Sequence, residues 1–405
     1  MSRRHRVLVT GIGTVSPAGA HAGRAFGQVL QANRSYTGPI KSVDVRDLKD
    51  QCGGEVTVAL PVLRSNRGGR ASTLAAYAAE IAINDARLDD APQRRVAVAV
   101  GTTNGESASI EDWARREGQD SRSKQDCHMQ PSGSGLEPHS LTASVIDHLR
   151  LQSVESQTFA TACAAGNYAI MYGAELIAHG DAQVAVVGGA DAYNRWGHVG
   201  FARLGAVAAS ECRPFDAHRD GMLPSEGAAF LVLESEQSAR KRSARVYAEL
   251  RGSALTCDAK HPTAPDQAGV VRCAELALER ARLDPSELDY ISAHGTGTHA
   301  NDLTEAGAMA LVLAASGRAT PISSVKSSLG HMMGAASAIG AAASCLSISG
   351  QFVPPTVHLR HVDPELEHAS LDFPRKARPG RVKAAMNNGF AFGGNNAITV
   401  FGEYS

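Results

Sequence analysis

One cysteine, Cys163, stands where a predicted strand turns into a predicted helix. A strand-like run at residues 157–161 precedes it. Small residues follow, and then apolar side chains at three- and four-residue spacing up to Gly180. The N–H groups and the positive dipole end of a helix start favour a thiolate. Cys163 is therefore a candidate nucleophile, and the alternative is an inert cysteine of the core.

Two later stretches carry histidines beside glycines. Residues 292–305 (SAHGTGTHANDLTE) place His294 at the end of a strand, and residues 323–336 (SSVKSSLGHMMGAA) place His331 after a Ser/Gly turn. Two neutral imidazoles near one cysteine could donate hydrogen bonds to an enolate or thioester oxygen. Each histidine alone could equally be a satisfied core or turn residue, so it is the combination that indicates a site.

A cation near the two histidines would keep them neutral, and Lys326 is the candidate. We expect Lys326 to pair with Glu305 or Asp302, and the alternative reading is a buried ion pair with a purely structural role. A third stretch, residues 386–396 (MNNGFAFGGNN), is a Gly-rich loop with two phenylalanines between the last two predicted strands. It could border the same site or be only a tight strand connection.

Bulk composition excludes several classes of function. The chain has 405 residues with 40 basic and 41 acidic side chains, so no overall charge favours nucleic acid or an anionic membrane. The seven cysteines show no CxxC pair and no Cys/His zinc spacing, which fits a reducing cytoplasm and predicts no metal site. The start of the chain resembles no secretory signal, and no later stretch reaches membrane-spanning length.

The order of predicted elements indicates a layered α/β protein. A polar, charged stretch at residues 235–245 suggests two halves, residues 1–240 with the cysteine and residues 241–405 with the histidines. The expected strands cover residues 6–10, 95–101, 157–161, 183–189, 229–234, 245–251, 288–293, 321–325, 382–387 and 397–402. The expected helices cover residues 71–86, 141–149, 270–282, 303–313 and 334–348.

These motifs together resemble the elongating β-ketoacyl-acyl carrier protein synthases, the condensing enzymes of type II fatty acid and polyketide synthesis. TACAAG, AHGTGT, VKSSLGHMMGAA and GFAFGGNN occur in the family's order, and the resemblance extends over essentially the whole chain. It implies a thiolase fold, two similar α/β halves forming a five-layered αβαβα architecture, which works as a dimer. It also implies an acyl carrier protein as partner, with substrates on its phosphopantetheine arm and no separate cofactor.

The resemblance assigns a role to each motif residue. Cys163 matches the acyl-accepting nucleophile, and His294 and His331 match the pair that drives decarboxylation of malonyl-carrier protein. Lys326 matches the lysine that orders this site, with Glu305 as its partner. Asp302 matches an acidic residue of the same network, and Phe392 with the N–H of Cys163 matches the gate and the oxyanion site. The residues that match the substrate pocket are Thr296, Thr298, Phe390, Asn104, His198 and Met333. The residues expected to dock the carrier protein are Arg64, Arg67 and Arg70.

Departures from the family pattern bear on the substrate. Ala391 replaces the middle glycine of the usual Phe-Gly-Phe-Gly-Gly loop, so we expect the gate to move differently. Asn104, and His198 with its neighbour Trp196, give the acyl pocket a polar or crowded wall. That wall favours a specialised polyketide or polyene-type substrate over a long saturated chain.

Other readings stay open at this point. A housekeeping fatty acid elongation synthase II would use the same chemistry, and a non-catalytic chain-length partner would usually lack the nucleophilic cysteine. The family's dimer interface falls near residues 121–138, which match family patterns poorly. A homodimer and a heterodimer with a related chain-length-factor-like subunit are therefore both possible.

Overall fold

The computed structural model describes residues 4–64, 68–89, 91, 94–120 and 136–405. In this part of the chain, one long sheet consists of two half-sheets with the same strand order. The first half-sheet runs β6 (Ser153–Phe159), β5 (Arg95–Gly101), β7 (Val184–Asp191), β8 (Gly227–Ser235) and β1 (Val7–Ser16). The second runs β11 (Thr320–Ser323), β10 (Tyr290–Ser292), β15 (Ala384–Ala391), β16 (Asn395–Gly402) and β9 (Ala248–Cys257).

Strand directions repeat as well as strand order. In the first half, β5 is parallel to β6 and β7, and β8 is antiparallel to both β7 and β1. In the second half, β10 is parallel to β11 and β15, and β16 is antiparallel to both β15 and β9. The halves join where β1 and β9 pair antiparallel. This repetition matches the expected likeness of the two halves, while the exact division at residue 240 stays a prediction.

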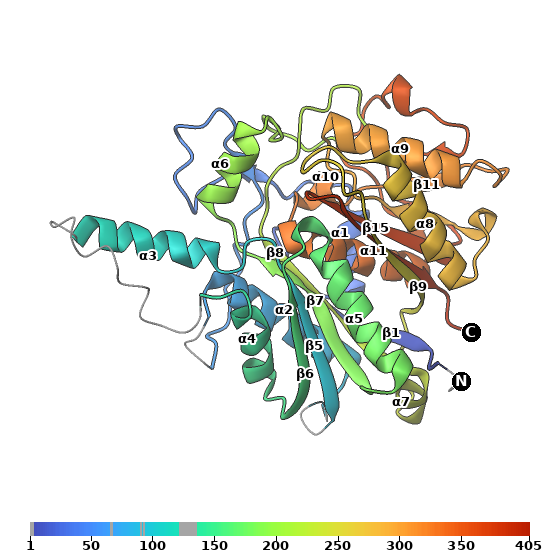
Figure 1. Cartoon of the computed structure of the whole chain (residues 1–405), viewed down its shortest axis with the longest axis horizontal. Helices are drawn as coiled ribbons and strands as arrows, with labels where there is room; N and C mark the ends of the chain where they lie inside the picture. Colours follow the sequence, from blue (N-terminus) through green and yellow to red (C-terminus); the bar gives the residue numbers. More distant parts are fainter. Residues whose placement is uncertain (1–3, 65–67, 90, 92–93, 121–135) are drawn as a thin grey trace.

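Helices cover both outer faces and fill the space between the half-sheets (Figure 1). Outside the first half-sheet lie α2 (Arg70–Ala86) and α4 (Ser140–Leu149), and outside the second lie α8 (Gln267–Ala281) and α9 (His299–Val312). Between the half-sheets lie α5 (Ala165–His179) and α11 (Ala336–Gly350). The expected five layers are therefore confirmed.

The strand β5 shows how its sequence determines two faces. Its valines at 96, 98 and 100 belong to the outer core against α2 and α4, while Ala97 and Ala99 belong to the inner core with α5. Small side chains on the inner face let the central helices lie close to the sheet. The central helices also approach each other closely, because a Cβ on Gly166 of α5 would lie 2.7 Å from the backbone nitrogen of Ala338 in α11.

Both central helices begin in the same unusual way. A 3₁₀ turn precedes each one, Ala162–Ala164 before α5 and Met333–Ala335 before α11. The first residue of each turn has a left-handed backbone, with φ of 50° at Ala162 and 45° at Met333. A non-glycine residue in this conformation is strained, and such strain is concentrated at functional sites.

Two predictions about elements need correction. Residues Met333–Gly350 are long and apolar enough to cross a membrane, so the reading that no stretch reaches that length was wrong. This segment is 89% buried inside the molecule, as the core helix between the half-sheets. The strand expected at residues 382–387 extends as β15 to Ala391 and stays paired with β16 up to Asn395.

The remaining elements surround the layers. The helix α3 (Ser107–Asp120) projects from the body, and α6 (Arg195–Arg203) lies near the top of Figure 1. The loop expected at residues 121–138 lies outside the described residues except for its last three. The smaller elements are α1 (Gly23–Gln31), α7 (Glu236–Lys241), α10 (Lys326–Leu329), β2 (Gly19–Ala22), β3 (Gly38–Pro39), β4 (Cys52–Gly53), β12 (Phe352–Val353), β13 (Leu371–Asp372) and β14 (Arg378–Pro379).

Candidate active site

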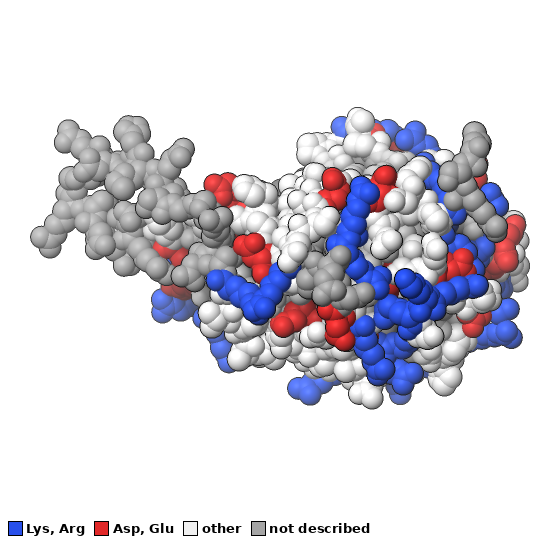
Figure 2. Space-filling view, turned by 90° about the horizontal axis from the view of Figure 1, so that it is seen from below, with Lys and Arg blue, Asp and Glu red and all other residues white. Residues whose placement is uncertain are grey.

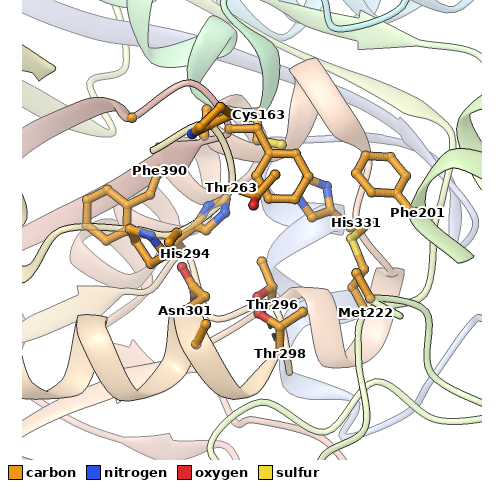
Figure 3. Close-up of a pocket in the computed structure, with 18 of the residues that line it drawn as sticks. Cys163, Phe201, Met222, Thr263, His294, Thr296, Thr298, Asn301, His331 and Phe390 are labelled. Carbon is orange, nitrogen blue, oxygen red and sulfur yellow. Dashed lines mark hydrogen bonds between the residues drawn. The ribbon is translucent and has the colours of Figure 1, made fainter. Parts of the chain in front are cut away.

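One cavity of about 90 Å³ brings together Cys163, His294 and His331 (Figure 3). These residues come from a helix start in the first half and from two loops of the second half, which the fold brings to the same point. Four further residues assigned from the sequence also line the cavity: Thr296, Thr298, Phe390 and Phe392. Sequence reasoning did not single out Phe201, Ala206, Met222, residues 261–265, Ala300 and Asn301, whereas Ala391 and Gly394 belong to the Gly/Phe loop that it did single out. Most of these have no chemistry that would mark them in a sequence.

Cys163 lies in the 3₁₀ turn before α5 and is only 7% exposed. Burial raises the pKa of its thiol to about 12, although the charge of Lys326 and a backbone hydrogen bond act in the opposite direction. The expected resting thiolate is therefore wrong for this structure, because desolvation outweighs the helix start. The cysteine rests as a thiol, and its proton must leave during the reaction.

The two imidazoles lie together, with ring centroids 5.6 Å apart and planes at 83°. Burial first, and the charge of Lys326 second, lower the pKa of both rings well below 6.5. Both rings are therefore neutral, which confirms the expectation. The backbone N–H of Met333 donates to Nδ1 of His331 at 3.1 Å, so the ring hydrogen of His331 is on Nε2.

His294 differs from His331 in its surroundings. Its ring lies 5.7 Å from that of Phe390, and its Nδ1 is buried without a hydrogen-bond partner among the described residues. A buried polar atom without a partner costs free energy unless a substrate or water satisfies it. His294 lines the cavity, and its unpaired Nδ1 lies on a part of the ring that is closed to solvent.

Lys326 is 2% exposed, and its Nζ donates to the backbone carbonyl of His294. It makes no ion pair within 4.0 Å with Glu305 or Asp302 among the described residues, so the expected direct pair is wrong. Burial lowers the pKa of the lysine, and the nearby charge of Glu305 opposes this effect. Lys326 thus holds the loop of His294 by a direct hydrogen bond, and it interacts with the carboxylates only by longer-range electrostatic attraction.

The two carboxylates bind the backbone of the His294 loop instead. Glu305 accepts the N–H of His294 at 2.8 Å and of Gly295 at 2.7 Å, and it also accepts the side-chain amide of Asn388 at 2.9 Å. Asp302 accepts the N–H of Thr296 at 3.1 Å. The helix α9 starts at His299, before the predicted start at 303, so both acids lie on its first two turns and face the loop.

Phe392 lies on the turn between β15 and β16 and is 41% exposed. Its ring centroid is 5.9 Å from that of Phe201 in α6, so two aromatic rings meet at the cavity. The left-handed backbone falls on Gly393 and Gly394, with φ of 85° and 76°, and not on Ala391. Ala391, which replaces a family glycine, is therefore unstrained in this conformation. The expectation of a different gate movement rested on strain at a positive φ, and Ala391 has no positive φ here.

Three residues expected in the pocket do not line this cavity. Asn104 donates its backbone N–H to Asp191 at 2.8 Å, and Met333 contributes its backbone to His331. His198 is buried against the hydroxyl of Tyr193 and bonds the carbonyl of Asp50 at 2.7 Å. Their roles toward a substrate stay predictions, and the neighbouring Trp196 is 69% exposed.

The expected docking arginines have different surroundings. Arg64 is exposed and Arg67 lies outside the described residues. Arg70 donates to the buried carboxylate of Glu226 at 2.6 and 2.7 Å and to the carbonyl of Val56 at 2.9 Å, which gives it a structural role. On the face seen in Figure 2, acidic side chains lie among the basic ones.

Two repeated α/β halves around two central helices, with a cysteine and two neutral histidines in one cavity, define a thiolase-fold enzyme that forms an acyl-cysteine. The model for the β-ketoacyl synthase N-terminal domain matches residues 4–239, and that for the C-terminal domain matches residues 247–360. The chain therefore belongs to the β-ketoacyl synthase family.

Similar proteins include both acyl-carrier-protein synthases and polyketide synthases. The chain is 35% identical to 3-oxoacyl-[acyl-carrier-protein] synthase 2 of Synechocystis, covering 99% of both chains. It is also 35% identical to a putative polyketide beta-ketoacyl synthase 1 of Streptomyces cyaneus, covering 98% of both. Among solved structures, the ishigamide ketosynthase/chain length factor is 40% identical, with a TM-score of 0.93, over 99% of this chain and 100% of the other. A type II polyketide ketosynthase in complex with its acyl-carrier protein is 32% identical, with a TM-score of 0.89 over the same shares.

Proposed function

We propose that the protein is a ketosynthase that joins an acyl group on Cys163 to the two-carbon unit of malonyl-acyl carrier protein, with loss of CO2. The observation that carries this proposal is the single cavity in which Cys163 faces two neutral imidazoles beside a buried lysine. Neutral N–H donors held in a buried cavity suit a developing enolate, because donors that are already in place need no reorganisation when the charge forms.

The first half-reaction transfers an acyl group from carrier phosphopantetheine to Cys163. The sulfur attacks the thioester carbonyl, the carbon–sulfur bond to phosphopantetheine breaks, and the cysteine proton ends on the released thiol. The backbone N–H groups of Cys163 and Phe392 are the proposed donors to the oxyanion, by family resemblance. The hydroxyls of Thr296 and Thr298 lie 2.8 Å apart at the cavity wall, where they can bond the phosphopantetheine arm.

The second half-reaction starts when malonyl-carrier protein enters. The bond between the malonyl methylene carbon and its carboxylate breaks, and CO2 leaves. The electron pair of that bond forms an enolate, whose oxygen accepts hydrogen bonds from Nε2–H of His331 and from His294. The enolate carbon then attacks the acyl group, and Cys163 leaves as a thiolate that regains a proton. Lys326 supports this step by its bond to the carbonyl of His294, and its charge adds to the burial that keeps both rings neutral.

We further propose a place in type II polyketide or polyene-type specialised metabolism. The support is the 40% identity to the ishigamide ketosynthase/chain length factor and the likeness to Streptomyces polyketide synthases. A housekeeping elongation synthase is the second candidate, because the Synechocystis synthase 2 is 35% identical. Cys163 argues against a non-catalytic chain-length partner.

The partners follow from the same proposal. An acyl carrier protein delivers the substrates, and a copy of this chain or a chain-length-factor-like subunit completes a dimer. Arg64 is a proposed docking residue for the acidic carrier. All six cysteines in the described part of the chain are free, which supports a cytoplasmic site of action.

Intact-mass measurement after incubation with a panel of acyl-carrier proteins tests the proposal. The panel holds saturated and conjugated chains, and Cys163→Ala is the control. A mass gain that the control lacks establishes the nucleophile, and preferred loading of conjugated chains supports polyene-type metabolism. Preferred loading of saturated chains of ten to sixteen carbons supports fatty acid elongation. If no chain loads, even with a candidate partner subunit added, the proposed function is wrong.

A further inference from the structure

Asp191 ends β7 and is completely buried, outside the lining of the active-site cavity. Its carboxylate accepts four hydrogen bonds. One oxygen accepts the hydroxyl of Thr102 and the N–H of Asn104, both at 2.8 Å. The other accepts the N–H of Thr103 at 2.8 Å and of Gly334 at 2.6 Å. Such a fully satisfied buried carboxylate fixes the groups around it.

These bonds join the two halves of the chain beside the reacting residues. Residues 102–104 follow β5 in the first half, while Gly334 lies in the 3₁₀ turn that follows His331 in the second half. The N–H of Met333, in the adjacent peptide, is the group that donates to Nδ1 of His331. Asp191 therefore binds the turn that sets the tautomer of the catalytic ring.

The turn needs such support. Met333 has a left-handed φ of 45°, a strained conformation that persists only where surrounding structure enforces it. The space around Gly334 is closed, because a Cβ there would lie 2.5 Å from Cα of Thr102 and 2.7 Å from an oxygen of Asp191. The turn is thus held between Asp191 and the 102–104 segment.

We propose that Asp191 is a positioning residue of the condensation reaction, which fixes the Met333–Gly334 turn and through it the orientation and Nε2–H tautomer of His331. The expected effect on the rate of decarboxylation rests on the proposed function. The His331 ring serves decarboxylation, whereas transfer of the acyl group to Cys163 needs no bond from that turn. Asp191 is therefore expected to affect the second half-reaction selectively.

A carboxylate is required because four donors converge on it. In Asp191→Asn, the amide group cannot accept, so either the N–H of Asn104 or those of Thr103 and Gly334 lose their acceptor, whichever way the amide turns. Glu106 offers a matched control, because it is equally buried but accepts the N–H of Ser72 in α2. Glu106→Gln makes the same change from carboxyl to amide at a buried position without touching the His331 turn.

The test compares both half-reactions in the full-length protein with its partner subunit, if one is needed. Acylation of Cys163 is followed by intact mass, and decarboxylation by CO2 release from malonyl-carrier protein. In Asp191→Asn we expect acylation within about threefold of the parent and decarboxylation about ten- to a hundredfold slower. In Glu106→Gln the ratio of the two rates is expected to stay unchanged. An equal loss in both half-reactions of Asp191→Asn, or no loss, would overturn the proposal.

A second readout does not depend on activity. In protein labelled with ¹⁵N-histidine, the His331 nitrogens report the tautomer, and Asp191→Asn is expected to shift them while those of His198 stay in place. Unchanged His331 signals contradict the proposal even if the parent proves inactive, in which case the proposed function fails separately. If Asp191→Asn does not fold, Asp191→Glu keeps the charge but displaces it from Gly334, and the same selective slowing of decarboxylation is required.

Discussion

Glu305→Gln is a sharp test of how this site is supported, because the change is nearly isosteric. The carboxylate is fully buried and accepts N–H bonds from His294, Gly295 and Asn388 at 2.7 to 2.9 Å. In glutamine one oxygen becomes an NH2 group that faces at least one of these donors. The variant loses a charge-assisted bond and leaves a buried donor unpaired, so we expect it to be less stable by about 2–3 kcal/mol.

The same change alters the charge of the site. Burial lowers the pKa of Lys326, and the charge of Glu305 opposes that effect, so removing the charge lowers the lysine pKa further. A smaller fraction of Lys326 is then protonated, so its positive charge lowers the pKa values of Cys163, His294 and His331 less strongly. All three pKa values are therefore expected to rise. Together with the loosened His294 backbone, this predicts malonyl decarboxylation slower by about a hundredfold, the usual cost of disturbing one oxyanion donor.

Urea denaturation and CO2 release measure the two effects. The control is Glu275→Gln, an exposed position on α8, which is expected to change the free energy of unfolding by less than about 0.5 kcal/mol. If Glu305→Gln unfolds at the parent's urea midpoint and decarboxylates malonyl-carrier protein at the parent's rate, the role assigned to Glu305 is wrong.

Three further predictions concern protonation and the gate. Because the thiol pKa of Cys163 is about 12, its alkylation by iodoacetamide should keep accelerating with pH beyond 10, and a plateau near 8.5 would contradict the assignment. Because His294 and His331 have folded-state pKa values below 6.5, the unfolded chain binds more protons below that pH. The free energy of unfolding should therefore fall on acidification by up to about 1.4 kcal/mol per pH unit for each ring, and His294→Asn/His331→Asn should lose this dependence in urea titrations. Phe201→Ala removes the ring that contacts Phe392, and we expect carrier-dependent acylation to be up to about tenfold slower. The control is Leu204→Ala, at an exposed position of the same region. Equal acylation rates in the two variants would refute a role of the Phe201–Phe392 contact in the gate.

The candidate catalytic residues and the layered fold could be predicted from the sequence because their signals are local. Alternating valine and alanine in Arg95–Gly101 indicate a strand with two different faces, and both faces are buried as expected. Cys163 stands at a break between a strand and a helical pattern, and the His294 and His331 stretches are short motifs readable without partners. Patterns of this kind need only a few neighbouring residues to specify a turn, a strand or a helix start.

What only the tertiary structure decided depends on burial and on distant backbone groups. The sequence suggested a thiolate at Cys163, yet desolvation by the surrounding layers makes it a thiol. It suggested that Lys326 pairs with a carboxylate, yet the lysine bonds the carbonyl of His294, 32 residues away. Asp191 carried no signal at all, because its bond to Gly334 joins residues 143 positions apart. The local dielectric and the set of polar groups that converge on one point exist only once both halves have folded around the central helices.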